Sequence, residues 1–415
     1  MFRKLRFLLI IAFLLLPLQG CWGMREIDEM GYVLLMGIDK GKENMVKVTF
    51  QIALPKPLGE EGSGDEVSTE IVEVEAASLF GAEQLLNTFV SKHITLIHNT
   101  TVVVSEEIAR EGLAKYINPL VRSREIRRTN YLLVVKGKAN DFIEKNRGLV
   151  FEKYPSRQLD ILMASSHLTG IMYKSDIHMF YKALKSPGRQ PVLAAVGISQ
   201  NVEAKASDES KIEEIKRENA YLPGEIPRKG GNKIDVIGQA VFKEERLVDF
   251  LNGEETRFYQ MVTGEFRQSI FSFPEPGSAG NFIIVMKIRK ACSPDITITA
   301  DERKTTIKVK LFLNGEIMSI QSGKNYEIGP LGNELERHIS GLITAGVSQL
   351  IKKTQKEYYS DIFGFGEFTR HFFWTWEEWE NYQWLEKYPY CAVEVQTFFR
   401  IRDPGMMSQT TSSDN

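Results

Sequence analysis

The sequence predicts an α+β fold, with strands and helices interleaved in the first half and strands predominating in the second. Apolar and polar residues alternate over Val46–Leu54, which is typical of a half-buried strand. Leu79, Ala82, Leu86 and Phe89 recur at helical spacing, so they share one face of a helix. Later in the chain, alternating segments flank one long amphipathic helix. Interleaved elements of this kind indicate sheets covered by helices.

The first twenty residues have the organisation of an export signal. Three positive residues precede an unbroken apolar run, Phe7–Leu16, which Pro17 ends. A positive region, an apolar region and a small residue, in that order, are typical of a signal peptide. Cys21 follows the small residue Gly20 directly, which indicates a bacterial lipoprotein signal cleaved between these two residues. We therefore expect a signal peptide over residues 1–20 and a covalent lipid, of the palmitate class, on Cys21.

The leader is expected to anchor the chain rather than to span the bilayer. A transmembrane helix needs roughly 20 apolar residues, and the run here is about half as long. Two acyl chains on Cys21 suffice for stable attachment. The formal net charge is −2, and −5 without the three positive leader residues, which gives no electrostatic case for binding nucleic acid. The same balance predicts no polybasic patch for lipid headgroups, so Cys21 is expected to carry the attachment alone.

The first half is predicted to begin with a short leader into the fold, Trp22–Gly37. Ser105 is a predicted helix N-cap, and the acidic residues that follow it suit the start of a helix. The other predicted strands are 70–75, 100–104 and 131–135, and the predicted helices are 106–120, 139–146 and most of 158–184. Residues 191–198 form an apolar segment.

The second half is predicted to contain strands at 235–243, 282–288, 307–313 and 393–401, with the long helix from Leu335 to Thr354. A charged stretch rich in Pro and Gly at its end separates the two halves. The predicted domains are the signal peptide 1–20, an N-terminal α/β region 21–198 divisible into two subdomains, a charged linker 199–234, a C-terminal α+β domain 235–402 and a disordered tail 403–415.

Few residues suggest catalysis or metal binding. The six histidines have no metal-ligand spacing, and no serine sits in a nucleophile elbow, so no catalytic residue, metal or cofactor is predicted. Phe363–Gly366 lacks the Lys-Ser/Thr of a phosphate loop and is predicted to be a tight turn. Cys292 and Cys391 are either buried thiols or a disulfide, and their spacing favours thiols.

The tryptophan-rich stretch near the C-terminus is the most unusual composition in the chain. Most of it is expected to be core between the long helix and the last strand, with some exposed part that docks another subunit. The candidate partner contacts are Trp374, Trp376, Trp379 and Trp384.

Several short blocks, in this order and spacing, resemble the Ger(x)C lipoproteins, the C subunits of nutrient germinant receptors in endospore-forming bacteria. The resemblance covers nearly all of the mature chain. Asp249 departs from it, since the family often has glycine there. The blocks are Cys21-Trp22, Arg25-Glu26-Ile27, Gly37-Ile38-Asp39, Ser105-Glu106-Glu107-Ile108-Ala109, Gly112-Leu113, Arg124-Glu125-Ile126-Arg127, Gly238-Gln239-Ala240-Val241-Phe242-Lys243, Asp361-Ile362-Phe363-Gly364-Phe365-Gly366, and Trp384 with Tyr388.

The resemblance implies an elongated architecture of about three mixed domains, each a sheet flanked by helices. It also implies a non-enzymatic receptor subunit on the outer surface of the inner spore membrane, beside integral-membrane subunits of the A and B types. A small-molecule nutrient is expected to be bound mainly elsewhere in the receptor. Two other functions fit the leader: a solute-binding lipoprotein of a transporter, which needs two similar lobes around a cleft, and a cell-wall hydrolase, which needs two close carboxylates in a deep cleft.

Overall fold

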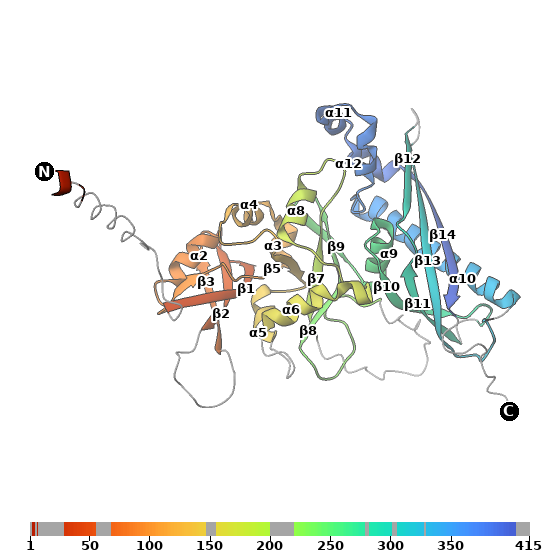
Figure 1. Ribbon diagram of the computed structural model, residues 1–415, viewed down its shortest axis with the longest axis horizontal. Helices are drawn as coiled ribbons and strands as arrows, with labels where there is room; N and C mark the ends of the chain where they lie inside the picture. The colour runs from red at the N-terminus through yellow and green to blue at the C-terminus, as the bar shows by residue number, and fades with distance from the viewer. Residues whose placement is uncertain are drawn as a thin grey trace.

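The computed structural model describes residues 2–4, 6, 29–54, 68–146, 155–199, 220–278, 282–300, 305–327 and 329–403. These residues form two β-sheets with helices packed on them, arranged one after the other along the long axis of the molecule (Figure 1). The mixed α and β fold expected from the sequence is confirmed. Cys21, the linker centre 200–219 and the tail 404–415 lie outside the described residues.

The first sheet has nine strands in the order β3-β2-β1-β5-β6-β7-β8-β9, with β4 paired to β1. Strands β1, β5, β6 and β7 run parallel to one another, and the outer strands are antiparallel to their neighbours, apart from the short parallel β4. The strands are β1 (Met30–Lys40), β2 (Val46–Leu54), β3 (Ser68–Ala76), β4 (His93–Thr95), β5 (Thr101–Ser105), β6 (Tyr131–Val135), β7 (Val192–Ile198), β8 (Ile234–Lys243) and β9 (Arg246–Leu251).

Helices cover both faces of this sheet. Apolar residues of α2 (Leu79–Leu86), α3 (Glu106–Glu111), α4 (Ala114–Arg122) and α8 (Ile177–Leu184) pack against one face. Those of α5 (Ala139–Lys145) and α6 (Pro155–Ala164) pack against the other, and the short α7 (Ser166–Thr169) follows α6. The parallel strands are therefore buried on both faces, as parallel strands usually are.

The second sheet has five strands and a third apolar core. Its order is β10-β11-β13-β12, and β14 pairs in parallel with β13. The elements are α9 (Gly253–Thr263), β10 (Gln268–Pro274), β11 (Ile283–Lys290), β12 (Asp295–Ala300), β13 (Thr305–Ile320), α10 (Pro330–Lys353), a π-helical turn (Thr354–Tyr358), a 3₁₀ helix (Phe365–Phe372), α11 (Trp376–Asn381), α12 (Trp384–Lys387), a second 3₁₀ helix (Tyr388–Tyr390) and β14 (Ala392–Asp403).

Three local predictions were wrong. The segment expected to be a leader contains the long strand β1 from Met30 onward. Its sequence has no charged residue before Asp39 and so shows no apolar/polar alternation, although its burial alternates up to Leu35. The helix expected over 106–120 is two helices, because Gly112 has φ 130° and ends the first. Phe89 lies beyond α2 and is 61% exposed rather than on its buried face.

The chain passes from the first sheet to the second later than the predicted linker suggested. β8 pairs antiparallel with β7 and β9 follows it, so both belong to the first sheet although the charged linker precedes them. A change of composition along the chain does not show which strands pair, because a strand pairs with its neighbour in the folded structure. The described residues form two sheets where about three were implied, and the division into domains itself stays a prediction.

Two glycines of α10 give opposite predictions for the same substitution. A Cβ on Gly346 would lie 2.5 Å from the Phe258 ring of α9, whereas one on Gly341 would meet nothing within 4 Å. Gly346→Ala is therefore expected to lower the free energy of unfolding by about 1–3 kcal/mol through overpacking. Gly341→Ala is expected to raise it by about 0.5–1 kcal/mol, since alanine favours helix. Urea unfolding checks both, and equal effects at the two positions would contradict this helix packing.

Candidate functional site

The tryptophans predicted to contact a partner divide into a buried pair and an exposed pair. Trp379 is 4% exposed and Trp384 is fully buried, whereas Trp374 is 95% exposed and Trp376 is 51% exposed. Trp379 and Trp384 were therefore wrongly included among the partner contacts, because neither presents a face to solvent. Trp374 and Trp376 stand at the surface around the start of α11.

The buried tryptophan Trp384 belongs to a polar network under the aromatic cluster. Its Nε1 donates to Oδ2 of Asp361 at 2.8 Å, and the backbone N–H of Gly366 donates to the same oxygen at 3.0 Å. The Gly364 N–H donates to Oδ1 at 3.0 Å, and Gly364 has φ 75°. The predicted tight turn is thus confirmed, and a buried carboxylate holds it in place.

Burial dominates the titration of this carboxylate. Asp361 is 1% exposed, and its burial raises its pKa to about 6 even though the Trp384 indole and backbone N–H groups of the turn favour the charged form. The group therefore titrates near neutrality inside the protein. Its hydrogen bonds are directed to the turn and to Trp384, so it serves the fold rather than a substrate.

The same turn fastens the two sheets together. The Gln190 N–H donates to the Asp361 carbonyl at 2.8 Å, and the Ser360 hydroxyl donates to the Phe242 carbonyl at 2.6 Å. A Cβ on Gly188 would lie 2.7 Å from the Gly366 carbonyl carbon, so this contact requires glycine. The loop before β7 and the end of β8 thus rest directly on the turn.

Asp249, where the resemblance departs from the expected glycine, has a specific role at this junction. It lies on β9 of the first sheet and accepts a hydrogen bond from the Tyr358 hydroxyl at 3.0 Å. Burial, followed by the charge of Asp249, raises the pKa of that tyrosine. The departure therefore adds a polar contact between the two sheets.

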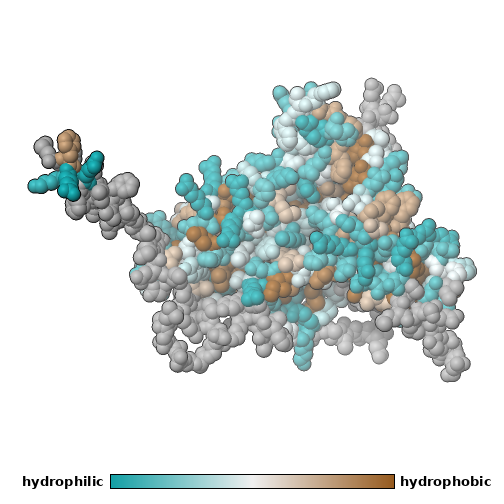
Figure 2. Space-filling view, viewed as in Figure 1, coloured by the Kyte–Doolittle hydropathy of each residue, from teal (hydrophilic) through white to brown (hydrophobic). Residues whose placement is uncertain are grey.

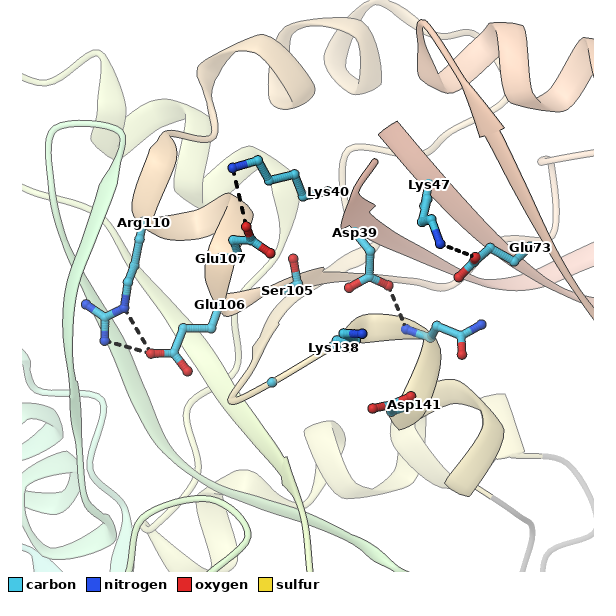
Figure 3. A pocket seen from close by; sticks show the side chains of 12 residues that line it. Asp39, Lys40, Lys47, Glu73, Ser105, Glu106, Glu107, Arg110, Lys138 and Asp141 are labelled. Atoms are coloured by element: carbon cyan, nitrogen blue, oxygen red, sulfur yellow. Dashed lines mark hydrogen bonds and ion pairs between the residues drawn. The ribbon is translucent and has the colours of Figure 1, made fainter. Parts of the chain in front are cut away.

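A groove of about 670 Å³ lies at the carboxyl ends of β1, β5 and β6 (Figure 3). This is the edge of a parallel sheet at which α/β proteins commonly bind ligands. Asp39, at the end of β1, accepts the backbone N–H groups of Ala139 and Asn140 at 2.8 Å each. Burial raises the pKa of Asp39, and those two N–H bonds oppose the rise. Asp39 thus holds the start of α5 against the sheet.

The charged side chains of this groove are mostly paired with one another. Arg110 pairs with Glu106 at 2.7 Å, Lys47 with Glu73 at 3.0 Å, and Lys40 with Glu107 at 3.3 Å. The Ser105 hydroxyl accepts the Ile108 N–H at 3.4 Å, which confirms it as a helix N-cap. These groups stabilise the sheet edge, and none is arranged as a nucleophile with its base.

Two of the sequence blocks named above contribute residues to this groove, although no groove was predicted there. The blocks Gly37-Ile38-Asp39 and Ser105-Glu106-Glu107 carried the resemblance as separate fragments, and the fold brings them to one sheet edge. Each block lies at the C-terminal end of an apolar segment, and this position was the feature of the sequence that could have indicated the groove. The parallel pairing of β1 with β5 could not be read from the sequence, because β1 itself was missed.

The remaining candidates can be placed within the described part of the chain. Cys292 is exposed and Cys391 is buried, and both are free thiols. Among the described residues no three His, Cys, Asp or Glu side chains are grouped so as to hold a metal ion. None of the described helices has the length and apolar character needed to cross a bilayer. Glu254 and Glu255 lie in the first turn of α9, where the helix dipole favours acidic side chains.

Comparisons with known proteins point to one family. Residues 23–198 match the family described as spore germination protein N-terminal domain, and residues 237–405 match the spore germination B3/GerAC-like C-terminal family. The chain is 26% identical over 405 residues to the putative spore germination protein YfkR of Bacillus subtilis, covering 95% of each chain. It is 23% identical to spore germination protein B3 of the same organism over 85% of each chain.

A solved structure shares the fold. The crystal structure of the GerBC protein superimposes with a TM-score of 0.51 and 17% sequence identity, covering 89% of this chain and 97% of that one. At this identity the likeness concerns the arrangement of the elements. It agrees with the mixed α and β fold described above.

Proposed function

This chain belongs to the GerAC family of spore germination proteins, and on that premise we propose that it is the lipid-anchored C subunit of a nutrient germinant receptor. In this proposal it is not an enzyme. It sits on the outer surface of the inner spore membrane and helps to convert nutrient binding into the start of germination. The main support is one coincidence of position: the family match begins at residue 23, two residues after the cysteine of the lipoprotein signal.

The proposed partners are the integral-membrane A and B type subunits of the receptor. A lipid on Cys21 would raise the local concentration of the folded body beside them, so a modest interface can suffice. Trp374 and Trp376 are the proposed contacts, because exposed tryptophan is enriched at interface hot spots. The small-molecule nutrient is proposed to bind mainly to those partners.

The other two functions find less support. A transporter-type binding protein needs two similar lobes, and the two sheets here differ in strand number and order. A hydrolase needs two close, free carboxylates in a deep cleft. Of the five groove acids, Glu73, Glu106 and Glu107 are ion-paired and Asp39 holds the start of α5, so Asp141 has no second free carboxylate beside it in the groove. The receptor subunit therefore remains the proposal that the family and the leader jointly favour.

Replacing Cys21 with alanine tests the anchor. Without the thiol no acyl chains can be attached, so at least tenfold less protein is expected in washed spore membranes, together with slower nutrient-triggered germination. Fractionation followed by immunoblotting measures the first, and loss of spore refractility measures the second.

Cys292→Ala is the matched control, since it removes an exposed cysteine from the folded body. It should leave both membrane retention and germination unchanged. Firm membrane binding and normal germination in the Cys21→Ala strain would contradict the anchor.

A further inference from the structure

Four arginines at the end of α4 and in the loop that leads to β6 have no partner among the described residues. Arg122, Arg124, Arg127 and Arg128 are exposed, and no ion pair or hydrogen bond involves their guanidinium groups. The one acid among them, Glu125, is turned inward, where it accepts the Thr95 hydroxyl at 3.0 Å and the Leu96 N–H at 2.8 Å. The loop therefore presents four positive charges to solvent.

Exposed apolar side chains lie next to this loop. Leu85, Phe89 and Ile97 are 45%, 61% and 49% exposed, and they flank the short strand β4. Ile97 directly follows Leu96, to which Glu125 binds, so the arginine loop and the apolar residues adjoin. The end of α2 is tied to β4 by the Ile94 N–H, which donates to Asn87 Oδ1 at 2.9 Å. We name these four arginines and three apolar residues the basic corner.

Neighbouring acids offset the arginines only in part. Glu125 contributes one formal negative charge against four positive ones, and its carboxylate is directed to the Thr95 hydroxyl and the Leu96 N–H. Burial, with a smaller contribution from Glu125, raises the pKa of Glu83 to about 7, so near neutral pH this carboxyl is partly uncharged. Asp176 holds the start of α8 by accepting the Met179 N–H at 2.7 Å. The four arginines therefore outnumber the charged acids beside them, and the basic corner keeps a net positive charge.

The basic corner lies where the proposed tether enters the fold. Met30, the first residue of β1, pairs with His93 of β4. Eight residues lie between Cys21 and Met30 in the sequence, and a fully extended chain from one to the other spans at most about 30 Å. In Figure 1, α2 and α4 lie on the side of the molecule away from β12 and β14, and in Figure 2 this side carries hydrophilic and hydrophobic residues next to one another.

We propose that the basic corner rests on the anionic headgroups of the bilayer that holds the Cys21 lipid. This inference rests on the proposed lipid anchor and adds an orientation to it. Arginine near an anionic membrane surface strengthens binding by roughly fivefold per residue, and exposed Leu, Phe and Ile enter the headgroup boundary. A lipid chain combined with a basic patch is a pair of signals that gives stable attachment. The first sheet then faces the bilayer at its α2–α4 end, and the second sheet projects away from it.

Vesicle binding by a chain that carries no lipid tests the basic corner independently of the proposed anchor on Cys21. The chain is produced from residue 21 onward with Cys21→Ala, which keeps every element of both sheets. It is floated with vesicles of pure phosphatidylcholine, or of phosphatidylcholine with about one third phosphatidylglycerol. Binding to the anionic vesicles is expected to be at least tenfold stronger and to weaken as salt rises, because salt screens exposed charges. The fourfold variant Arg122→Gln, Arg124→Gln, Arg127→Gln, Arg128→Gln is expected to lose this preference.

A charge-matched variant serves as the control. Arg267, Arg337, Lys352 and Arg402 are exposed residues of the part of the chain that forms the second sheet, and their replacement by Gln should leave vesicle binding unchanged. Circular dichroism confirms that both variants fold. Equal binding of the unsubstituted chain to both vesicles would overturn the inference and direct attention to an acidic protein segment as the ligand. Undiminished binding by the four-arginine variant would overturn it as well, and neither result depends on whether Cys21 carries lipid.

Discussion

Replacing Asp361 with alanine is expected to lower the free energy of unfolding by about 3–5 kcal/mol. The substitution leaves three buried donors without an acceptor: the Gly364 and Gly366 N–H groups and the Trp384 Nε1–H. Each unsatisfied buried donor costs about 1–3 kcal/mol, and local relaxation recovers part of the sum. Because the turn also carries the contact between the sheets, we expect the second sheet to loosen from the first.

Urea unfolding followed by tryptophan fluorescence measures this loss. Glu367→Gln is the matched control, since it removes an exposed carboxylate from the same turn and should change stability by less than about 0.5 kcal/mol. If Asp361→Ala behaved like the control, the carboxylate would not be holding the turn.

The effect of Asp361→Ala should also depend on pH. The pKa of Asp361 is raised to about 6 in the folded protein from an ordinary value of 3.8, so the folded state binds this proton more tightly than the unfolded chain. The contribution of the carboxyl group to stability is then greatest at low pH and falls as pH rises through about 6. The stability difference between the wild type and Asp361→Ala should therefore be larger at about pH 4.5 than at about pH 8, and the opposite trend would contradict the raised pKa.

Trp384→Ala is expected to cost about 3–5 kcal/mol, whereas Trp374→Ala should change stability by less than about 0.5 kcal/mol. Trp384 is fully buried and donates to Asp361, so its removal leaves a cavity and breaks a hydrogen bond. Trp374 is 95% exposed, so its removal leaves the core intact. The two variants test whether the tryptophan-rich stretch is divided between core and surface.

The same pair of variants also separates stability from function. Under the proposed receptor role, Trp374→Ala is expected to weaken co-purification with the integral-membrane subunits while the protein accumulates normally. Trp384→Ala is expected to lower the amount of protein itself. Equal losses of stability for both variants would contradict the assignment of Trp374 to the surface.

Local pattern was sufficient to predict many of the elements. β2 and β6 were predicted at their observed bounds, because alternating and short apolar segments are readily recognised as strands. The polar face of β2 is nevertheless buried too, since Thr49 is 0% and Gln51 2% exposed. β1 was missed because its sequence has no charged residue before Asp39 and so resembles any apolar run. The placement of β8 beside β7 across the charged linker was missed because it is a long-range pairing.

The sites were harder to predict, for related reasons. The groove of Asp39 and Ser105 is assembled from the ends of parallel strands, so its residues are far apart in the sequence. A low net charge suggested that there was no basic patch, yet four arginines stand within seven residues, at 122–128. Total charge concealed them, because acids elsewhere in the chain balance the sum while the fold keeps the four together at one surface.

The most direct test of the account is mass spectrometry of the protein purified from spore membranes. The account predicts a mature chain that begins at Cys21 and whose first peptide carries the added mass of a diacylglyceryl group. A chain that retains residues 1–20, or that begins elsewhere with an unmodified residue, would contradict it.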